Sequence, residues 1–201
     1  MPGRPCQRER RQQADMSRLL WILAALLAGP FPFAAEAARA DAPAVEPLVI
    51  NGCGIWPHTR CRGADLRHAD LSGRNLAGAD LSWTNLARAN LRGANLAGAN
   101  LDGADLTGAK LNKVNAPAAT FRNARIFRAD FSGADFTAAN LEAARANFAW
   151  FVGARLIGAN LQEAKFATVN LQNAVMEGCV LRYAIFPDSA FDGCIGCPKD
   201  W

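Results

Sequence analysis

The stretch Ala94-Asn95-Leu96-Ala97-Gly98, Ala99-Asn100-Leu101-Asp102-Gly103, Ala104-Asp105-Leu106-Thr107-Gly108 repeats one pattern every five residues. The same phase holds from Ala64 to about Phe191 without an inserted or deleted residue. A helix has a period of about 3.6 residues and a plain strand a period of about 2, so neither keeps a period of five in phase over this length. Short fixed periods are typical of repeat architectures, in which each unit buries its apolar face by stacking on the next.

Three positions of the repeat have a restricted composition. The central position occurs 26 times between Leu66 and Phe191, and it is Leu, Phe, Ile or Met everywhere except at Ala116 and Ala146. Two positions before the centre Ala occurs 20 times, and one position before the centre Asn or Asp occurs 15 times. Residues two apart lie on the same side of an extended segment, so the large and the small residue can both point into a narrow tube. The remaining positions are rich in residues that favour turns.

These features resemble the motif A-(D/N)-L-x-x of the pentapeptide-repeat family, and the resemblance covers roughly two thirds of the chain. It implies an all-β fold, a right-handed quadrilateral parallel β-helix in which four repeats make one coil, with about 6.5 coils here. We expect an N-terminal extension and signal peptide over 1–40, a linker and N-terminal cap over 41–63, the β-helix over 64–193 and a C-terminal cap or tail over 194–201. Too few residues remain for a second sizeable domain.

The N-terminal segment 1–40 has the pattern of an export signal. Met16-Ser17-Arg18 precedes an apolar run, Leu19 to Ala28, and small residues follow up to Ala38-Arg39-Ala40. A charged start, a short apolar core and an Ala-x-Ala site are typical of a secretory signal peptide. We expect cleavage after Ala40, or near Ala38, and a periplasmic or secreted bacterial protein without stable membrane insertion; an uncleaved membrane anchor is the alternative. We expect Met16 to be the true start, with Met1 as the alternative.

Five cysteines follow the predicted cleavage site, and export favours disulfides among them. In a β-helix the two groups lie at opposite ends, so pairing must be local: Cys53 with Cys61, and either Cys194 with Cys197 or Cys179 with Cys194. A redox role for the Cys194–Cys197 dithiol would need the motif at the start of a helix, and the sequence provides no such context. A metal site would need further ligands, but His58 and His68 lie at the other end.

With four repeats per coil, residues 20 apart stack on one another. The column Asp65, Asn85, Asp105, Arg125, Arg145, Lys165 therefore changes sign midway. Exposed aromatic residues beside arginines are typical of recognition surfaces. The candidate interaction surface consists of Arg125, Phe127, Arg128, Arg145, Phe148, Trp150 and Lys165. Alternatively, Phe148 and Trp150 fold over the gap that Ala146 leaves in the core.

The central residue shifts from Leu towards Phe after Phe121, and we expect the core to widen slightly there without a change of coil. Pro117 stays in phase at the changeover, so we place it at a corner, where its missing N–H matters least.

No catalytic motif, cofactor-binding loop or metal-ligand cluster occurs in the sequence, so we predict a protein that is not an enzyme and needs no cofactor. Residues 41–201 carry 16 Lys and Arg against 15 Asp and Glu, a balance that does not call for nucleic acid as a partner. We predict a rigid scaffold that binds a protein partner, with a homodimer through a coil end as a further option. Two alternatives are a DNA mimic that binds topoisomerases, as some family members do, and a thiol–disulfide redox protein.

Overall fold

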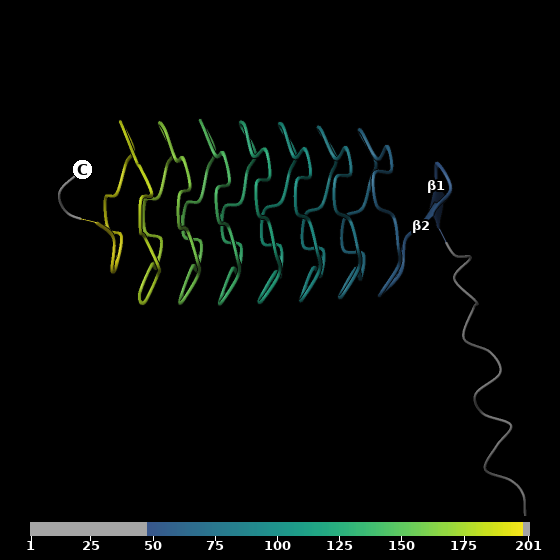
Figure 1. The fold of residues 1–201 in the computed structure, drawn as a ribbon, viewed down its shortest axis with the longest axis horizontal. Coiled ribbons are helices and arrows are strands. Elements are labelled where there is room, and N and C mark those ends of the chain that lie inside the picture. The colour runs from purple at the N-terminus through teal and green to yellow at the C-terminus, as the bar shows by residue number, and fades with distance from the viewer. Residues whose placement is uncertain (1–47, 199–201) are drawn as a thin grey trace, which may run out of the picture. The chain divides into compact units, whose positions relative to one another are not determined.

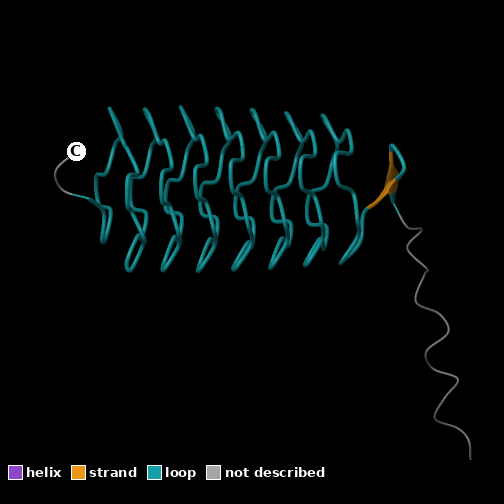
Figure 2. Cartoon of the chain, viewed as in Figure 1, coloured by secondary structure: helices purple, strands orange, loops and turns teal. Residues whose placement is uncertain are grey.

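The computed structural model describes residues 48–198, most of which form a stack of coils (Figure 1). Two short strands precede the stack: β1 (Val49–Ile50) and β2 (Cys53–Gly54) pair antiparallel, with Val49 opposite Gly54 and Ile50 opposite Cys53. The rest of the described chain is drawn as loops and turns (Figure 2), because each further ladder position is a single bridging residue. No helix occurs between residues 48 and 198.

The register of the stack is constant along its whole length. Parallel bridges join residues 20 apart, from Arg60 with Asp80 to Val175 with Ile195. In each coil the central N–H donates to a carbonyl of the next coil, as from Leu66 to Asn85 at 2.8 Å, and the Asn85 N–H donates back to the Ala64 carbonyl at 2.9 Å. Each coil therefore consists of four repeat units. This confirms the predicted all-β quadrilateral β-helix.

A turn of one type closes every corner. The Ala69 N–H donates to the Leu66 carbonyl at 3.1 Å, and His68, the third residue of that turn, has a φ of 59°. The equivalent position is positive in φ at every fifth residue from His58 to Gly193. One positive φ at the third residue defines a type II turn, which favours proline at the second residue. Pro117 lies at that second position, at a corner as predicted.

The Asn or Asp before each centre has a specific hydrogen-bonding role. Its side-chain oxygen accepts the N–H of the first residue after the centre, as when the Thr107 N–H donates to Asp105 Oδ1 at 2.9 Å. This Asx turn is unbroken from Asp65 to Asp105, and it recurs at five later positions. Asn115 has no such bond because Pro117, two residues on, lacks an N–H. The motif thus satisfies a backbone donor that the ladder leaves free.

The central side chains fill the inside of the coils. From Leu66 to Met176 they are 0–1% exposed, whereas Leu181 and Phe191 in the last coil are only partly buried. Neighbouring phenylalanine rings in the second half have centroids 5.0–6.4 Å apart, over Phe121, Phe131, Phe136, Phe151, Phe166, Phe186 and Phe191. The two small central residues, Ala116 and Ala146, are buried and lie in register with Phe136 and Phe166 of the next coil. The bridging register does not change between the leucine part and the phenylalanine part of the core.

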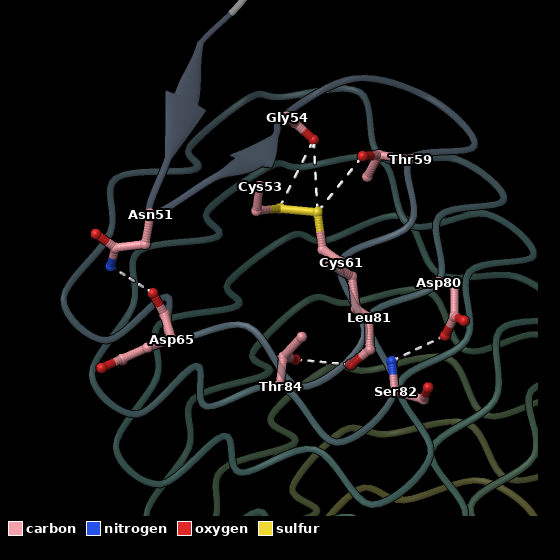
Figure 3. Close-up of a disulfide and its surroundings, with 10 residues drawn as sticks. All are labelled: Asn51, Cys53, Gly54, Thr59, Cys61, Asp65, Asp80, Leu81, Ser82 and Thr84. Carbon is pink, nitrogen blue, oxygen red and sulfur yellow. Dashed lines mark hydrogen bonds between the residues drawn. A yellow bond between two sulfur atoms is a disulfide. The ribbon is translucent and has the colours of Figure 1, made fainter. Parts of the chain in front are cut away.

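Disulfides occur at both ends of the stack. Cys53 of β2 is bonded to Cys61, with Cα atoms 5.3 Å apart, and Asn51 Nδ2 donates to the Asp65 carbonyl at 2.7 Å (Figure 3). The hairpin is therefore fastened to the first coil by a covalent and a polar contact. At the other end Cys194 is bonded to Cys197, with Cα atoms 5.9 Å apart. Of the two predicted pairings, the structure therefore contains Cys194 with Cys197 and not Cys179 with Cys194.

Cys179 remains a free, half-buried thiol. Its Sγ donates to the Leu156 carbonyl at 2.8 Å, and burial raises the pKa of the thiol to about 11. A thiol with so high a pKa is a poor nucleophile at neutral pH.

The predicted signal peptide, the tether up to Pro47 and the C-terminal residues 199–201 lie outside the described residues. Within residues 48–198, no helix has the length and apolar character to cross a membrane. The same part of the chain contains no group of three or more potential metal ligands.

Candidate interaction surface

The basic column on one face of the stack forms the centre of the candidate surface. Bridges place Arg125 on Asp105, Arg145 on Arg125 and Lys165 on Arg145. Arg125 also forms an exposed ion pair with Asp105, at 3.8 Å between nitrogen and oxygen. Arg145 and Lys165 are exposed and form no salt bridge within the described residues. The three cations therefore lie in a row at the spacing of paired strands, about 4.8 Å, and only Arg125 is paired with a carboxylate.

An aromatic cluster lies at the corner beside this column. The rings of Phe127 and Phe148 meet edge to face with centroids 5.5 Å apart. The Arg128 guanidinium lies over both rings, 5.1 Å from the centroid of Phe127 and 6.0 Å from that of Phe148. Phe148 remains 46% exposed. Phe148 therefore packs against these two side chains on the outside of the stack.

Trp150 belongs to the adjoining face. It bridges Asp130 and Asn170, in a column different from that of Arg145, and 55% of it is exposed. The structure thus brings together six of the seven predicted residues on one face and its corner, and it places Trp150 next to them around that corner. Whether these residues bind a partner stays a prediction.

The sequence interpretation missed a row of backbone donors on the same face. The Asx turn requires Asn or Asp before the centre, and the column instead carries Arg125, Arg145 and Lys165. As a result the N–H groups of Phe127, Asn147 and Ala167 have no acceptor among residues 48–198. The signal was present in the sequence, as three successive departures from the motif in one column.

Two polar side-chain atoms without a partner lie in the same turn column. Thr107 Oγ1 and Asn147 Oδ1 are buried, and neither atom forms a hydrogen bond within the described residues. In the bridging register these residues lie one coil before and one coil after Phe127. Buried polar atoms without partners are uncommon in native proteins, so their position beside the aromatic cluster distinguishes this corner from the others.

The fold places the chain among β-helical proteins built from five-residue repeats, and a comparison with protein families identifies its family. The sequence model for pentapeptide repeats matches eight copies in this chain, over residues 55–82, 75–112, 104–142, 119–158, 139–167 and 159–195. The chain therefore belongs to the pentapeptide-repeat family. The comparison with curated proteins found no match.

Several solved structures are similar to the chain. A pentapeptide repeat protein from the thylakoid lumen of Arabidopsis thaliana is 35% identical, over 52% of this chain and 69% of its own, with a TM-score of 0.34. QnrB1, a plasmid-mediated fluoroquinolone resistance protein, is 21% identical over 63% of this chain and 81% of its own, with a TM-score of 0.44. HetL, a pentapeptide repeat protein involved in heterocyst differentiation regulation in the cyanobacterium Nostoc sp., is 22% identical. The match covers 69% of this chain and 89% of HetL, with a TM-score of 0.24.

Proposed function

We propose that this protein is an exported, non-catalytic scaffold that binds a protein partner through the basic–aromatic patch, defined as Arg125, Phe127, Arg128, Arg145, Phe148, Trp150 and Lys165. The observation that carries the proposal is the exposed cluster in which Arg128 lies over the rings of Phe127 and Phe148, beside a column of three cations. Arginine and aromatic side chains supply much of the binding energy at protein interfaces.

The charge distribution supports an acidic partner surface. Residues 48–198 carry 15 Lys and Arg against 12 Asp and Glu, so the stack as a whole is nearly balanced. On the face of the patch, however, no acidic residue occurs between Asp105 and Asp188 in the column or in the corner that carries Phe127 and Phe148; Glu142 and Glu163 lie in the corner on the other side of the column. A local excess of one sign on a balanced surface steers a partner of the opposite sign to that place.

Export rests on the sequence of the N-terminal segment 1–40 and is supported by the two disulfides, Cys53–Cys61 and Cys194–Cys197. Structural disulfides persist in oxidising compartments and are rare in a bacterial cytosol. The proposed location is therefore the periplasm or the exterior of a bacterial cell.

The alternatives have less support. A DNA mimic needs a strongly acidic surface, and this stack has a small excess of cations. A redox role for Cys194 and Cys197 needs an activated thiolate, usually at a helix N-terminus, and the described residues contain no helix. Association of two copies through a coil end stays a prediction, and the partly exposed Leu181 and Phe191 at the last coil are the residues it would bury.

Chemical crosslinking in the native cell envelope tests the proposal. The patch variant is Arg145→Glu/Trp150→Ser, and the matched control is Arg155→Glu/Trp83→Ser, which changes an arginine and an exposed tryptophan elsewhere on the stack. We expect a specific crosslinked protein with the wild type and the control, and its loss with the patch variant. The same partners in all three proteins would show that the patch is not the binding surface.

A further inference from the structure

From the geometry of the uncapped turns we propose that the face carrying Arg125, Arg145 and Lys165 is a carboxylate-binding strip for an acidic peptide segment of a protein partner. This deepens the proposed function and rests on it. The strip is defined as these three cations together with the backbone N–H groups of Phe127, Asn147 and Ala167.

The first half of the same column shows where a carboxylate would bind. Thr107 donates its N–H to Asp105 Oδ1 at 2.9 Å, and Ala87 donates its N–H to Asn85 Oδ1 at 3.1 Å. The next three coils after Asp105 keep the same backbone register. The free N–H groups of Phe127, Asn147 and Ala167 therefore lie in a row at the strand spacing of about 4.8 Å. An oxygen supplied from outside can therefore take the place that the Asp or Asn side chain occupies in the earlier coils.

The chain contains an internal example of the proposed contact. Thr120 precedes its centre and does not accept the Arg122 N–H, and a carboxylate from the coil before accepts it instead. Asp102 Oδ1 accepts this N–H at 2.9 Å, and Asp102 Oδ2 accepts the guanidinium Nε of the same arginine at 2.8 Å. One carboxylate thus binds a free turn N–H and an arginine at once, the two kinds of donor that the strip offers. Such charge-assisted bonds are stronger than those between neutral groups.

Several features favour a peptide over other polyanions. A corner runs along one side of the strip, and there Phe127 and Phe148 present ring surface, with Phe148 46% exposed. An extended peptide can place an apolar side chain there while its Asp or Glu side chains reach the column. Within the chain itself, the groups that bind a turn N–H and an arginine together are carboxylates, those of Asp65 and Asp102.

The test measures binding of a fluorescein-labelled decaglutamate to the full chain by fluorescence anisotropy, at constant ionic strength. The strip variant is R125N/R145N/K165N, which removes the cations and restores an Asx side chain on each free N–H. The control is K110Q/K113Q/R155Q, which removes the same charge from the other faces. We expect the strip variant to bind about tenfold or more weakly and the control to bind within about twofold of the wild type. Equal losses in the two variants, or no binding by the wild type, would overturn the proposal.

A second variant separates the backbone donors from the cations. R125Q/R145Q/K165Q removes the same charge but carries a side chain one carbon too long for an Asx turn. We expect it to bind decaglutamate more tightly than the Asn variant, by about threefold or more. In NMR spectra the amide signals of Phe127, Asn147 and Ala167 should shift on addition of the peptide. Unmoved amide signals would show that these donors do not bind the carboxylates.

The same assay identifies the polyanion. Dextran sulfate or a single-stranded DNA oligomer that displaces the peptide at a lower charge concentration would assign the strip to that ligand and overturn the peptide proposal. The two proposals also fail in different ways. A crosslinked partner without decaglutamate binding would leave the proposed function standing and remove the strip, whereas decaglutamate binding without any envelope partner would do the reverse.

Discussion

Residues 65–107 and residues 116–195 of this stack share one backbone and differ in the side chains that support it. In the first region every turn N–H after a centre is accepted by an Asn or Asp, and the core is built from leucine. In the second region five of the turns keep that side chain, and seven of the 16 central core residues are phenylalanine. The parallel bridges nevertheless keep the same register through both regions.

The comparison separates what the fold requires from what it permits. Both regions keep the inward central residue, the small residue two positions before it and the turn with one positive φ. The residue before the centre is replaceable, at the cost of a backbone donor that must find another acceptor or face water. The second region uses that freedom on one face for Arg125, Arg145 and Lys165. Departure from the motif is therefore where a specific surface can be built on a repetitive fold.

The largest effect is expected from opening the aromatic core of the second region. Phe136 packs against Phe121, Phe131 and Phe151, so Phe136→Ala should lower the free energy of unfolding by about 3–5 kcal/mol. Phe148→Ala, which removes a ring from the outside of the same region, should cost about 1 kcal/mol. Urea denaturation followed by circular dichroism measures both. Equal losses would mean that the rings do not form a packed core.

A smaller effect tests whether the alanines make room for the rings. Ala146→Leu restores the central residue typical of the first region, but Phe166 occupies the next coil of the same column. We expect overpacking to cost about 1–3 kcal/mol in urea unfolding. An increase in stability would show that the site at Ala146 is an unfilled cavity.

A reciprocal exchange tests the Asx turn directly. Arg145→Asn gives the second region the side chain of the first, and should raise the free energy of unfolding by about 1 kcal/mol, because the Asn147 N–H gains an acceptor. Asn85→Arg makes the opposite exchange and removes the bond to the Ala87 N–H, so it should lower stability by about the same amount. Changes of the same sign in the two variants would contradict this account.

The smallest effect is on the acid side of the pH profile. Hydrogen bonds from Ser72 and Ser82 hold the pKa values of Asp70 and Asp80 below the usual range. Because the folded pKa is lowered, this stabilisation is present above the unfolded pKa of about 3.9 and is lost as the pH falls through the folded value. The melting temperature should thus change little between pH 7 and 5 and fall below pH 4. Asp70→Asn/Asp80→Asn should flatten that decline; an unchanged decline would assign it to other carboxylates.

The sequence predicts the fold well because the repeat leaves little freedom: a fixed phase of five dictates the columns, and Cys61 falls into the central series and is buried. The cation column follows from the same arithmetic. The contact of Arg128 with Phe127 and Phe148 does not, because it depends on side-chain rotamers at a corner. The pairing of Cys194 with Cys197 likewise depends on the path of the chain after the last complete turn.

The constant bridging register also means that the orientation of a surface depends on a count of repeats. Removing or duplicating four units would change the length of the stack by one coil and leave every side chain on its original face. Removing or duplicating a single unit would instead advance all later residues by one face, about a quarter of a turn. The direction in which Arg145 and Lys165 point, relative to the hairpin held by Cys53 and Cys61, is therefore set by the number of units between them. A deletion that preserves the fold can thus still redirect the strip, and only multiples of four units leave its direction unchanged.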